Sequence, residues 1–337
     1  MANVLITLAE DKEATTQSHF AVKYRVDEND CYDFASALIA LGHDVFFVNW
    51  NDLSGTKFTR MFHQNCKRFV EPDALSDMDL IFVYKMEGFY FDLPRFHRMV
   101  RTFERSGAVV VNDPRTIRHN INKRYYWDLA AAGVRISPVA TIDGGLRERL
   151  TSGERFVLKP LLGERGHGVI LASEPADLAK IRGKESLFIA QKFMPEIRQG
   201  ERSLVFLGMQ FQHAVIKRPA ANNLEEFRCN ESLGGTVAVY EPRADELEYA
   251  LQILQSYESL ACPVHFSRID LIDAEAGPTL VEAELLNPSI YANYSQRGQE
   301  FGQQIATYFD RIIQGRKKLT PITAAWSTQS SSQARVG

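Results

Sequence analysis

The sequence predicts an α/β fold in which a parallel-sheet domain is followed by further lobes of mixed α and β structure. In the first hundred residues, short apolar runs alternate with segments of helical periodicity, an order typical of a parallel sheet with crossover helices. The chain has 337 residues, which is too long for one small core and fits two or three lobes.

The N-terminal domain is expected at residues 1–112. Residues 4–8 form an apolar run that predicts a buried strand, and residues 33–41 have a helical periodicity that stops at Gly42. The further elements expected in this domain are strands at 45–48, 80–84 and 108–111 and a helix at 94–104.

The rest of the chain is expected to form two lobes, at residues 113–195 and 196–317, and a tail. Apolar runs and helical periodicity predict strands at 156–158, 169–172, 188–193, 269–272 and 280–285 and helices at 122–130 and 302–313. Residues 318–337 are rich in Ser, Gln and Thr, and we expect a disordered tail there.

The composition is that of an ordinary globular protein, with 45% hydrophobic residues and a formal net charge of −3. Because there is no basic excess, neither nucleic acid nor a membrane surface is an expected partner. No apolar run has the length of a membrane span or the flanks of a secretory leader. The cysteines lack the CxxC spacing, which indicates reduced thiols in a cytoplasmic protein; they are Cys31, Cys66, Cys229 and Cys262.

Acidic residues are inserted into two apolar runs near the C-terminal end. Asp270 lies in the first run, and Glu282 and Glu284 lie two residues apart in the next, on one face of a strand. Carboxylates are costly to bury unless they are paired or bound to a metal. Three of them on adjacent strands would suit Mg²⁺, which shares its other positions with nucleotide phosphates and water. The alternative is a strand with acids on its solvent side.

A glycine-rich tip joins the strands predicted at 156–158 and 169–172. It contains Gly163, Gly166 and Gly168, with Arg165 and His167 between them. Glycines adopt positive φ and let the backbone approach a ligand closely, so that successive N–H groups can hold phosphate. The segment lacks the Gly-Lys-Ser/Thr of a P-loop, and no helix follows as in a Rossmann fingerprint. A flexible hairpin tip without a ligand is the alternative.

Four further motifs complete a recognisable order along the chain. Lys123 opens a helical stretch, Lys159 ends a strand, Lys217-Arg218-Pro219 ends another, and Arg228-Cys229-Asn230 precedes two glycines. Together with the glycine-rich tip and the acids, this order resembles the ATP-grasp superfamily over roughly residues 110–290. Within the superfamily, the chain is most similar to prokaryotic glutathione synthetase and the ribosomal-protein glutamate ligases.

The chain departs from glutathione synthetase at one motif. Where that family has Glu-x-Asn, this chain has Glu282-Ala283-Glu284, although Pro288 keeps its place. The Glu-x-Glu form is similar to a group of small-molecule ligases that includes the enzyme closing the D-cycloserine ring. Metal binding should survive the change, because carboxylate is a better Mg²⁺ ligand than an amide. The identity of the substrate does not carry over.

The resemblance implies a nucleotide clasped between the two α+β lobes, with ATP and Mg²⁺ or Mn²⁺ as cofactors. It places phosphate-binding groups at Lys123, Lys159, Gly163, Gly166, His167 and Gly168. It places the adenine hinge at Gln191, Lys192, Phe193 and Met194 and the ribose contact at Glu201. It places catalytic groups at Arg218, Arg228 and Asn230 and metal ligands at Asp270, Glu282 and Glu284. The alternatives are solvated charges and an ordinary core strand; Asn287 is expected to cap a turn rather than to bind metal.

The resemblance further implies an ADP-forming carboxylate–amine ligase that acts on small amino-acid-like substrates through an acyl phosphate, in a cytoplasmic dimer or tetramer. Three alternatives stay open: ring closure of a single substrate, a kinase that stops at phosphoryl transfer, and a nucleotide-binding regulator without catalysis. Candidates for the substrate pocket are Tyr24, Arg25, Lys85, Glu87, Ser289, Tyr291 and Tyr294.

Overall fold

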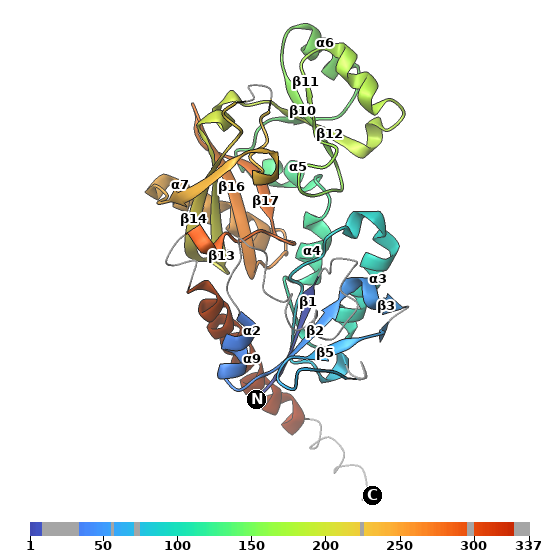
Figure 1. The fold of residues 1–337 in the computed structure, drawn as a ribbon, viewed down its shortest axis with the longest axis vertical. Coiled ribbons are helices and arrows are strands. Elements are labelled where there is room, and N and C mark those ends of the chain that lie inside the picture. Colours follow the sequence, from blue (N-terminus) through green and yellow to red (C-terminus); the bar gives the residue numbers. More distant parts are fainter. Residues whose placement is uncertain (9–33, 55–56, 71–74, 223–225, 295–299, 327–337) are drawn as a thin grey trace, which may run out of the picture.

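The computed structural model describes residues 1–8, 34–54, 57–70, 75–222, 226–294 and 300–326, with side chains described up to residue 315. Figure 1 shows an N-terminal domain at one end, a small central lobe at the other, and a C-terminal lobe between them. Of the residues singled out from the sequence, Tyr24, Arg25 and Cys31 lie outside the described residues.

The N-terminal domain is built on a six-stranded sheet in the order β6-β5-β2-β1-β7-β8. Strands β2, β1, β7 and β8 are parallel, which confirms the predicted sheet, and β5 and β6 extend it in antiparallel pairing. The strands are β1 (Asn3–Leu8), β2 (Asp44–Asn49), β5 (Met61–His63), β6 (Arg68–Val70), β7 (Leu80–Phe82) and β8 (Val109–Val111), with a separate ribbon of β3 (Leu53–Ser54) and β4 (Lys57–Phe58).

Helices cover both faces of this sheet. Helix α3 (Leu93–Arg105) packs on one face with Phe96, Val100 and Phe103, whose spacing gives an apolar stripe. Asp92 caps the helix by accepting a hydrogen bond from the backbone N–H of Arg95. Helices α2 (Phe34–Ala40) and α9 (Phe301–Trp326) pack on the other face.

Helix α9 follows the C-terminal lobe in sequence but packs against the N-terminal sheet. Its Phe309 ring meets the edge of Phe82, with the two centroids 4.9 Å apart, and Figure 1 shows α9 lying beside α2. We expected this helix within the third lobe, ending near residue 313, and a disordered tail from residue 318. The helix instead continues to Trp326, and the remaining residues lie outside the described part of the chain.

The central lobe is a four-stranded antiparallel sheet in the order β11-β10-β12-β9. Its strands are β9 (Val139–Ala140), β10 (Phe156–Pro160), β11 (Ile170–Ala172) and β12 (Phe188–Lys192). Helix α6 (Gly144–Thr151) covers it with Leu146 and Leu150. Helices α4 (Pro114–Asn120) and α5 (Tyr125–Ala131) connect the lobe to the first domain. The glycine-rich tip joins β10 to β11, as the sequence predicts.

The C-terminal lobe is a five-stranded antiparallel sheet in the order β15-β14-β13-β16-β17. Its strands are β13 (Glu201–Leu207), β14 (Gln210–Arg218), β15 (Thr236–Tyr240), β16 (Phe266–Ala274) and β17 (Gly277–Glu284). Helix α7 (Ala244–Ser259) packs on the sheet with Ala250, Ile253 and Leu254. Among the described residues, no helix combines the length and apolar character that crossing a bilayer requires.

Candidate active site

A cavity of about 260 Å³ lies beneath the glycine-rich loop, defined here as residues 162–168, and between the central and C-terminal lobes. Most of the predicted site residues line it: Lys123, Lys159, Gly163, Gly166, His167, Gln191, Lys192, Phe193, Met194, Glu201, Arg228, Asn230, Asp270, Glu282 and Glu284. These residues come from seven different segments of the chain. Two predicted residues, Gly168 and Arg218, are not among the residues that line this cavity.

The acidic part of the wall is formed where β16 and β17 pair. Asp270 lies directly opposite Glu282 in the ladder, and Arg268 lies opposite Glu284. Because residues two apart on a strand share a face, this pairing brings all four charged side chains to one side of the sheet.

Asp270 is already saturated with hydrogen bonds. Its carboxylate accepts two from Arg268, both at 2.8 Å, one from Lys217 at 3.2 Å and one from Ser203 at 2.6 Å. Burial alone would raise the pKa of Asp270, but Arg268 and Lys217 hold it well below its usual range. The residue is therefore ionised and only 1% exposed. A buried carboxylate with two cationic partners anchors those cations in the wall of the cavity.

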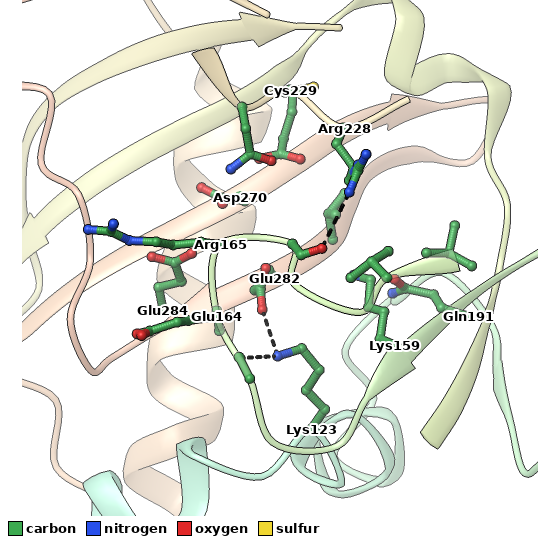
Figure 2. A pocket seen from close by; sticks show the side chains of 18 of the residues that line it. Lys123, Lys159, Glu164, Arg165, Gln191, Arg228, Cys229, Asp270, Glu282 and Glu284 are labelled. Atoms are coloured by element: carbon green, nitrogen blue, oxygen red, sulfur yellow. Dashed lines mark hydrogen bonds and ion pairs between the residues drawn. The ribbon is translucent and has the colours of Figure 1, made fainter. Parts of the chain in front are cut away.

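Glu282 and Glu284 have fewer partners and face the cavity. Glu282 Oε1 lies 3.4 Å from Lys123 Nζ, and Glu284 Oε1 lies 2.7 Å from Arg268 Nη2. Burial raises the pKa of Glu284 to about 7 despite the attraction of Arg268. The pKa of Glu282 is lowered, because Lys123 and Lys159 outweigh its burial. Figure 2 shows Lys123 between Glu282 and the glycine-rich loop.

The predicted triad of metal-binding carboxylates is not assembled as such. Among the described residues, no three acidic, histidine or cysteine side chains are placed to hold one ion, because each acid lies against a basic side chain. The oxygen donors nonetheless suit a hard cation. Glu282 and Glu284 line the cavity, and within the described part of the chain the buried Oδ1 of Asn287 has no hydrogen-bond partner. Carboxylate and amide oxygens are the ligands that Mg²⁺ takes from proteins.

The glycine-rich loop adopts backbone conformations that favour glycine. Gly166 and Gly168 both have φ of 70°. A Cβ at Gly166 would lie 3.3 Å from Arg228 Cδ, and one at Gly168 would lie 3.0 Å from Pro160 Cγ. Lys123 Nζ donates to the carbonyl of Gly163 at 3.0 Å. The loop thus closes tightly over two predicted cations, and the close approach requires residues without side chains.

The opposite part of the wall is apolar. Phe193 and Met194 pack in a small cluster with Ile272, and all three line the cavity. Gln191 is only 3% exposed, and its Nε2 has no hydrogen-bond partner among the described residues. A buried donor without a partner destabilises the folded protein, so we expect this amide to donate a hydrogen bond to an acceptor on a bound ligand. Lys192 turns its ammonium toward Glu154, at 3.2 Å.

Of the two basic residues at the end of β14, the structure brings the unpredicted one to the cavity. Arg218 is exposed, whereas Lys217 is buried, lines the cavity and pairs with Glu201 and Asp270. The alternation of side chains along a strand explains why only one of two neighbours can face the site. Arg268, also not predicted, shares a face with Asp270 two residues later. That i, i+2 spacing is a signal the sequence contained.

Among the substrate-pocket candidates, Lys85, Ser289 and Tyr291 line the cavity. Glu87 instead forms an ion pair with Arg165 of the loop. Tyr294, which is not among the lining residues, donates from its hydroxyl to Glu231 at 2.7 Å.

A comparison with protein families agrees with this geometry. The model for the ATP-grasp domain of prokaryotic glutathione synthetase matches residues 137–296, which carry the glycine-rich loop, the hinge strand and the acids. The chain is related to the ATP-grasp ligases over this region. This confirms both the resemblance and the fold class inferred from the sequence.

Proteins similar to this chain include the glutathione synthetase of Synechocystis sp., 27% identical over 214 residues that cover 60% of this chain and 63% of that protein. The cycloserine biosynthesis protein DcsG of Streptomyces lavendulae is 28% identical over 219 residues, which cover 56% of this chain and 70% of that protein. The matched regions thus span less than two thirds of the Synechocystis enzyme.

Solved structures match this chain over nearly its whole length. The crystal structure of D-cycloserine synthetase DcsG has a TM-score of 0.68 at 18% identity, covering 90% of this chain and 99% of that one. D-alanine–D-alanine ligase from Bacillus anthracis has a TM-score of 0.62 at 13% identity, covering 94% and 100%. At these identities the likeness is one of fold.

Proposed function

We propose that the protein is an ATP-dependent, ADP-forming ligase that joins a small carboxylic acid to an amine through an acyl phosphate. The observation that carries this proposal is the single cavity under the glycine-rich loop, whose apolar wall around Phe193 and Met194 continues into a charged wall around Lys123, Arg268 and the acids. A nucleotide has the same division into an apolar base and a charged phosphate chain.

The apolar wall suits adenine, and the unpaired Nε2 of Gln191 supplies a donor for a ring nitrogen. Lys123 and Lys159 line the cavity next to the glycine-rich loop and would hold the phosphates. In the ligand-free arrangement, Lys123 is neutralised by Glu282. A nucleotide phosphate would pair with Lys123 in place of Glu282 and leave Glu282 free to bind a cation. Nucleotide and metal would therefore each increase the affinity for the other.

The residues that would hold Mg²⁺ or Mn²⁺ are Glu282 and Glu284, with Asp270 behind them. When bound, such an ion neutralises charge on the phosphates and orients them for in-line transfer. A solved structure of the ATP-grasp ligase PsnB contains Mg and ADP, and it shares the fold with a TM-score of 0.54.

The chain's own contribution to the reaction is positioning and charge. A substrate carboxylate would attack the γ-phosphorus of ATP, and Arg268, Lys217 and Arg228 would stabilise the charge on the transferred phosphoryl group. Asp270 keeps Arg268 and Lys217 oriented, because it binds both. An amine would then attack the acyl carbon of the resulting acyl phosphate, forming the C–N bond of the amide, while the acyl C–O bond breaks and inorganic phosphate leaves. Closure of the glycine-rich loop would exclude the water that would otherwise hydrolyse the acyl phosphate.

Substrates of this kind would be small and amino-acid-like, bound at the part of the cavity lined by Lys85, Ser289 and Tyr291. A second candidate function is ring closure within a single substrate. The Glu-x-Glu motif and the match to the cycloserine biosynthesis protein over 70% of its length favour it. A dimer or tetramer remains part of the proposal by analogy with the family.

The test is release of ADP and of phosphate, measured separately, with Mg-ATP and a panel of amino acids and small carboxylic acids, singly and in pairs. E282Q is the inactive variant, and E248Q, on the exposed face of α7, is the matched control. Turnover that needs a pair and disappears only in E282Q supports the ligase. Turnover with one compound supports ring closure, ADP without phosphate supports a kinase, and nucleotide binding without turnover contradicts the proposal.

A further inference from the structure

We propose that Asn287 is a positioning residue with two simultaneous tasks: its amide hydrogens hold the closed glycine-rich loop, and its amide oxygen ligates the metal ion that Glu282 and Glu284 bind. The two tasks use different atoms of one side chain, so they can be removed separately. This inference rests on the proposed function, since it assumes that the cavity takes a metal–nucleotide complex.

The first task is visible in the contacts of Glu164, a residue of the glycine-rich loop. Its Oε2 accepts a hydrogen bond from Asn287 Nδ2 at 2.8 Å, and its Oε1 accepts one from the backbone N–H of Gly88 at 2.8 Å. One carboxylate thereby joins the loop to the N-terminal domain and to the segment after β17. The ion pair between Arg165 and Glu87 adds a second connection to the same segment of the N-terminal domain.

The second task follows from the orientation of the Asn287 amide. A carboxylate only accepts hydrogen bonds, so the amide must turn its NH₂ group toward Glu164 and its oxygen away. That oxygen is buried and has no hydrogen-bond partner among the residues that the structure describes, and Asn287 lines the cavity together with Glu282 and Glu284. An unpaired buried acceptor destabilises the protein unless a ligand satisfies it. A hard cation held by the neighbouring carboxylates would do so.

The backbone at this position restricts the choice of residue. Asn287 has φ of 60°, a left-handed conformation that asparagine, aspartate and glycine tolerate better than other residues. Of these three, only asparagine offers both a donor for Glu164 and a neutral oxygen for a cation. A turn before Pro288, as expected from the sequence, explains the backbone but not the unpaired oxygen.

The experiment separates the two tasks with three variants that respect the backbone. N287G removes both groups, N287D keeps an oxygen but loses the amide hydrogens, and E164A removes only the partner on the loop. E148A, on the exposed face of α6, is the control. Calorimetry gives the dissociation constant of ADP without metal and with saturating Mg²⁺, and the ratio of the two measures how strongly the metal binds in the complex.

We expect N287G to reduce this ratio by about tenfold or more. N287D should keep or raise it, because a carboxylate is a stronger Mg²⁺ ligand than an amide, and E164A should keep it within about threefold, because the Asn287 oxygen remains. The loop gives a second readout: trypsin cleavage after Arg165, followed by mass spectrometry, should be faster in N287G, N287D and E164A than in the wild type, since all three lose the contact with Glu164. E148A should match the wild type in both measurements.

If the wild-type ratio is well above one and N287G keeps the same ratio, this inference is wrong and the proposed function stands. A ratio lost equally in N287G and E164A would also overturn it, because the metal would then depend on the loop and not on the Asn287 oxygen. A wild-type ratio near one, or no binding of ADP, would overturn the metal or nucleotide part of the proposed function together with this inference.

Discussion

Replacing Glu284 by glutamine should make the ligand-free protein more stable at alkaline pH. Burial raises the pKa of this carboxyl to about 7, from an ordinary value of 4.5. Between these pH values the folded protein holds a proton that the unfolded chain has lost, so stability falls as the pH rises through this window. The difference between the two pKa values corresponds to about 3 kcal/mol of unfolding free energy, since a shift of one pKa unit corresponds to about 1.4 kcal/mol.

Glutamine has the shape of the protonated side chain at every pH. E284Q should therefore match the wild type near pH 4.5 and exceed its unfolding free energy by up to about 3 kcal/mol at pH 8.5. Urea denaturation followed by tryptophan fluorescence, in EDTA and without nucleotide, measures the difference at a series of pH values. E248Q on α7 is the control and should stay within about 0.5 kcal/mol of the wild type.

Parallel stability curves for E284Q and the wild type between pH 4.5 and 8.5 would refute the reasoning. Ionisation of the Glu284 carboxyl would then not lower the free energy of unfolding. Its charge beside Glu282 and Asp270 would require no bound cation to offset it. The expected curves would instead show that Glu284 lowers the stability of the protein because its negative charge is held in the cavity. Residues that favour function at the expense of stability are common at active sites.

Three further outcomes follow from the site. R268M should lower kcat by about a hundredfold or more, whereas R218M should leave it within about threefold, because only the first residue lines the cavity; steady-state ADP release measures both. G168A should raise KM for ATP and lower the thermal midpoint slightly, since a Cβ would press on Pro160 at 3.0 Å and alanine is strained at the φ of 70° found there. Q191L should weaken ADP binding in calorimetry while raising the urea midpoint of the ligand-free protein, because it removes the unpaired donor.

Local patterns in the sequence were sufficient for the elements and for the position of the acids. The apolar runs around Leu158 and Ile269 became β10 and β16, and the period of two along a strand placed Glu282 and Glu284 on one face, as expected. The glycine spacing correctly located the loop over the cavity. These features depend only on neighbours within a few residues.

Contacts between segments that are far apart in the chain could not be predicted from the sequence. The packing of α9 on the N-terminal sheet brings Phe309 into contact with Phe82, and the local sequence of neither segment predicts this contact. The saturation of Asp270 depends on three partners from three strands, so a metal triad and a set of ion pairs look alike in the sequence. Strand alternation required that Lys217 and Arg218 face opposite ways, but the register of β14 decided which one faces the cavity.

The central claim is that this cavity transfers the γ-phosphoryl group of ATP to a substrate carboxylate. The most direct measurement uses the acid found active in the panel, labelled with ¹⁸O in its carboxyl group, and mass spectrometry of the phosphate released. An acyl-phosphate route predicts phosphate containing one ¹⁸O atom, because the attacking carboxylate oxygen leaves with phosphorus. Phosphate without label, formed at the same rate as ADP, would mean that water attacks ATP directly and would contradict the account.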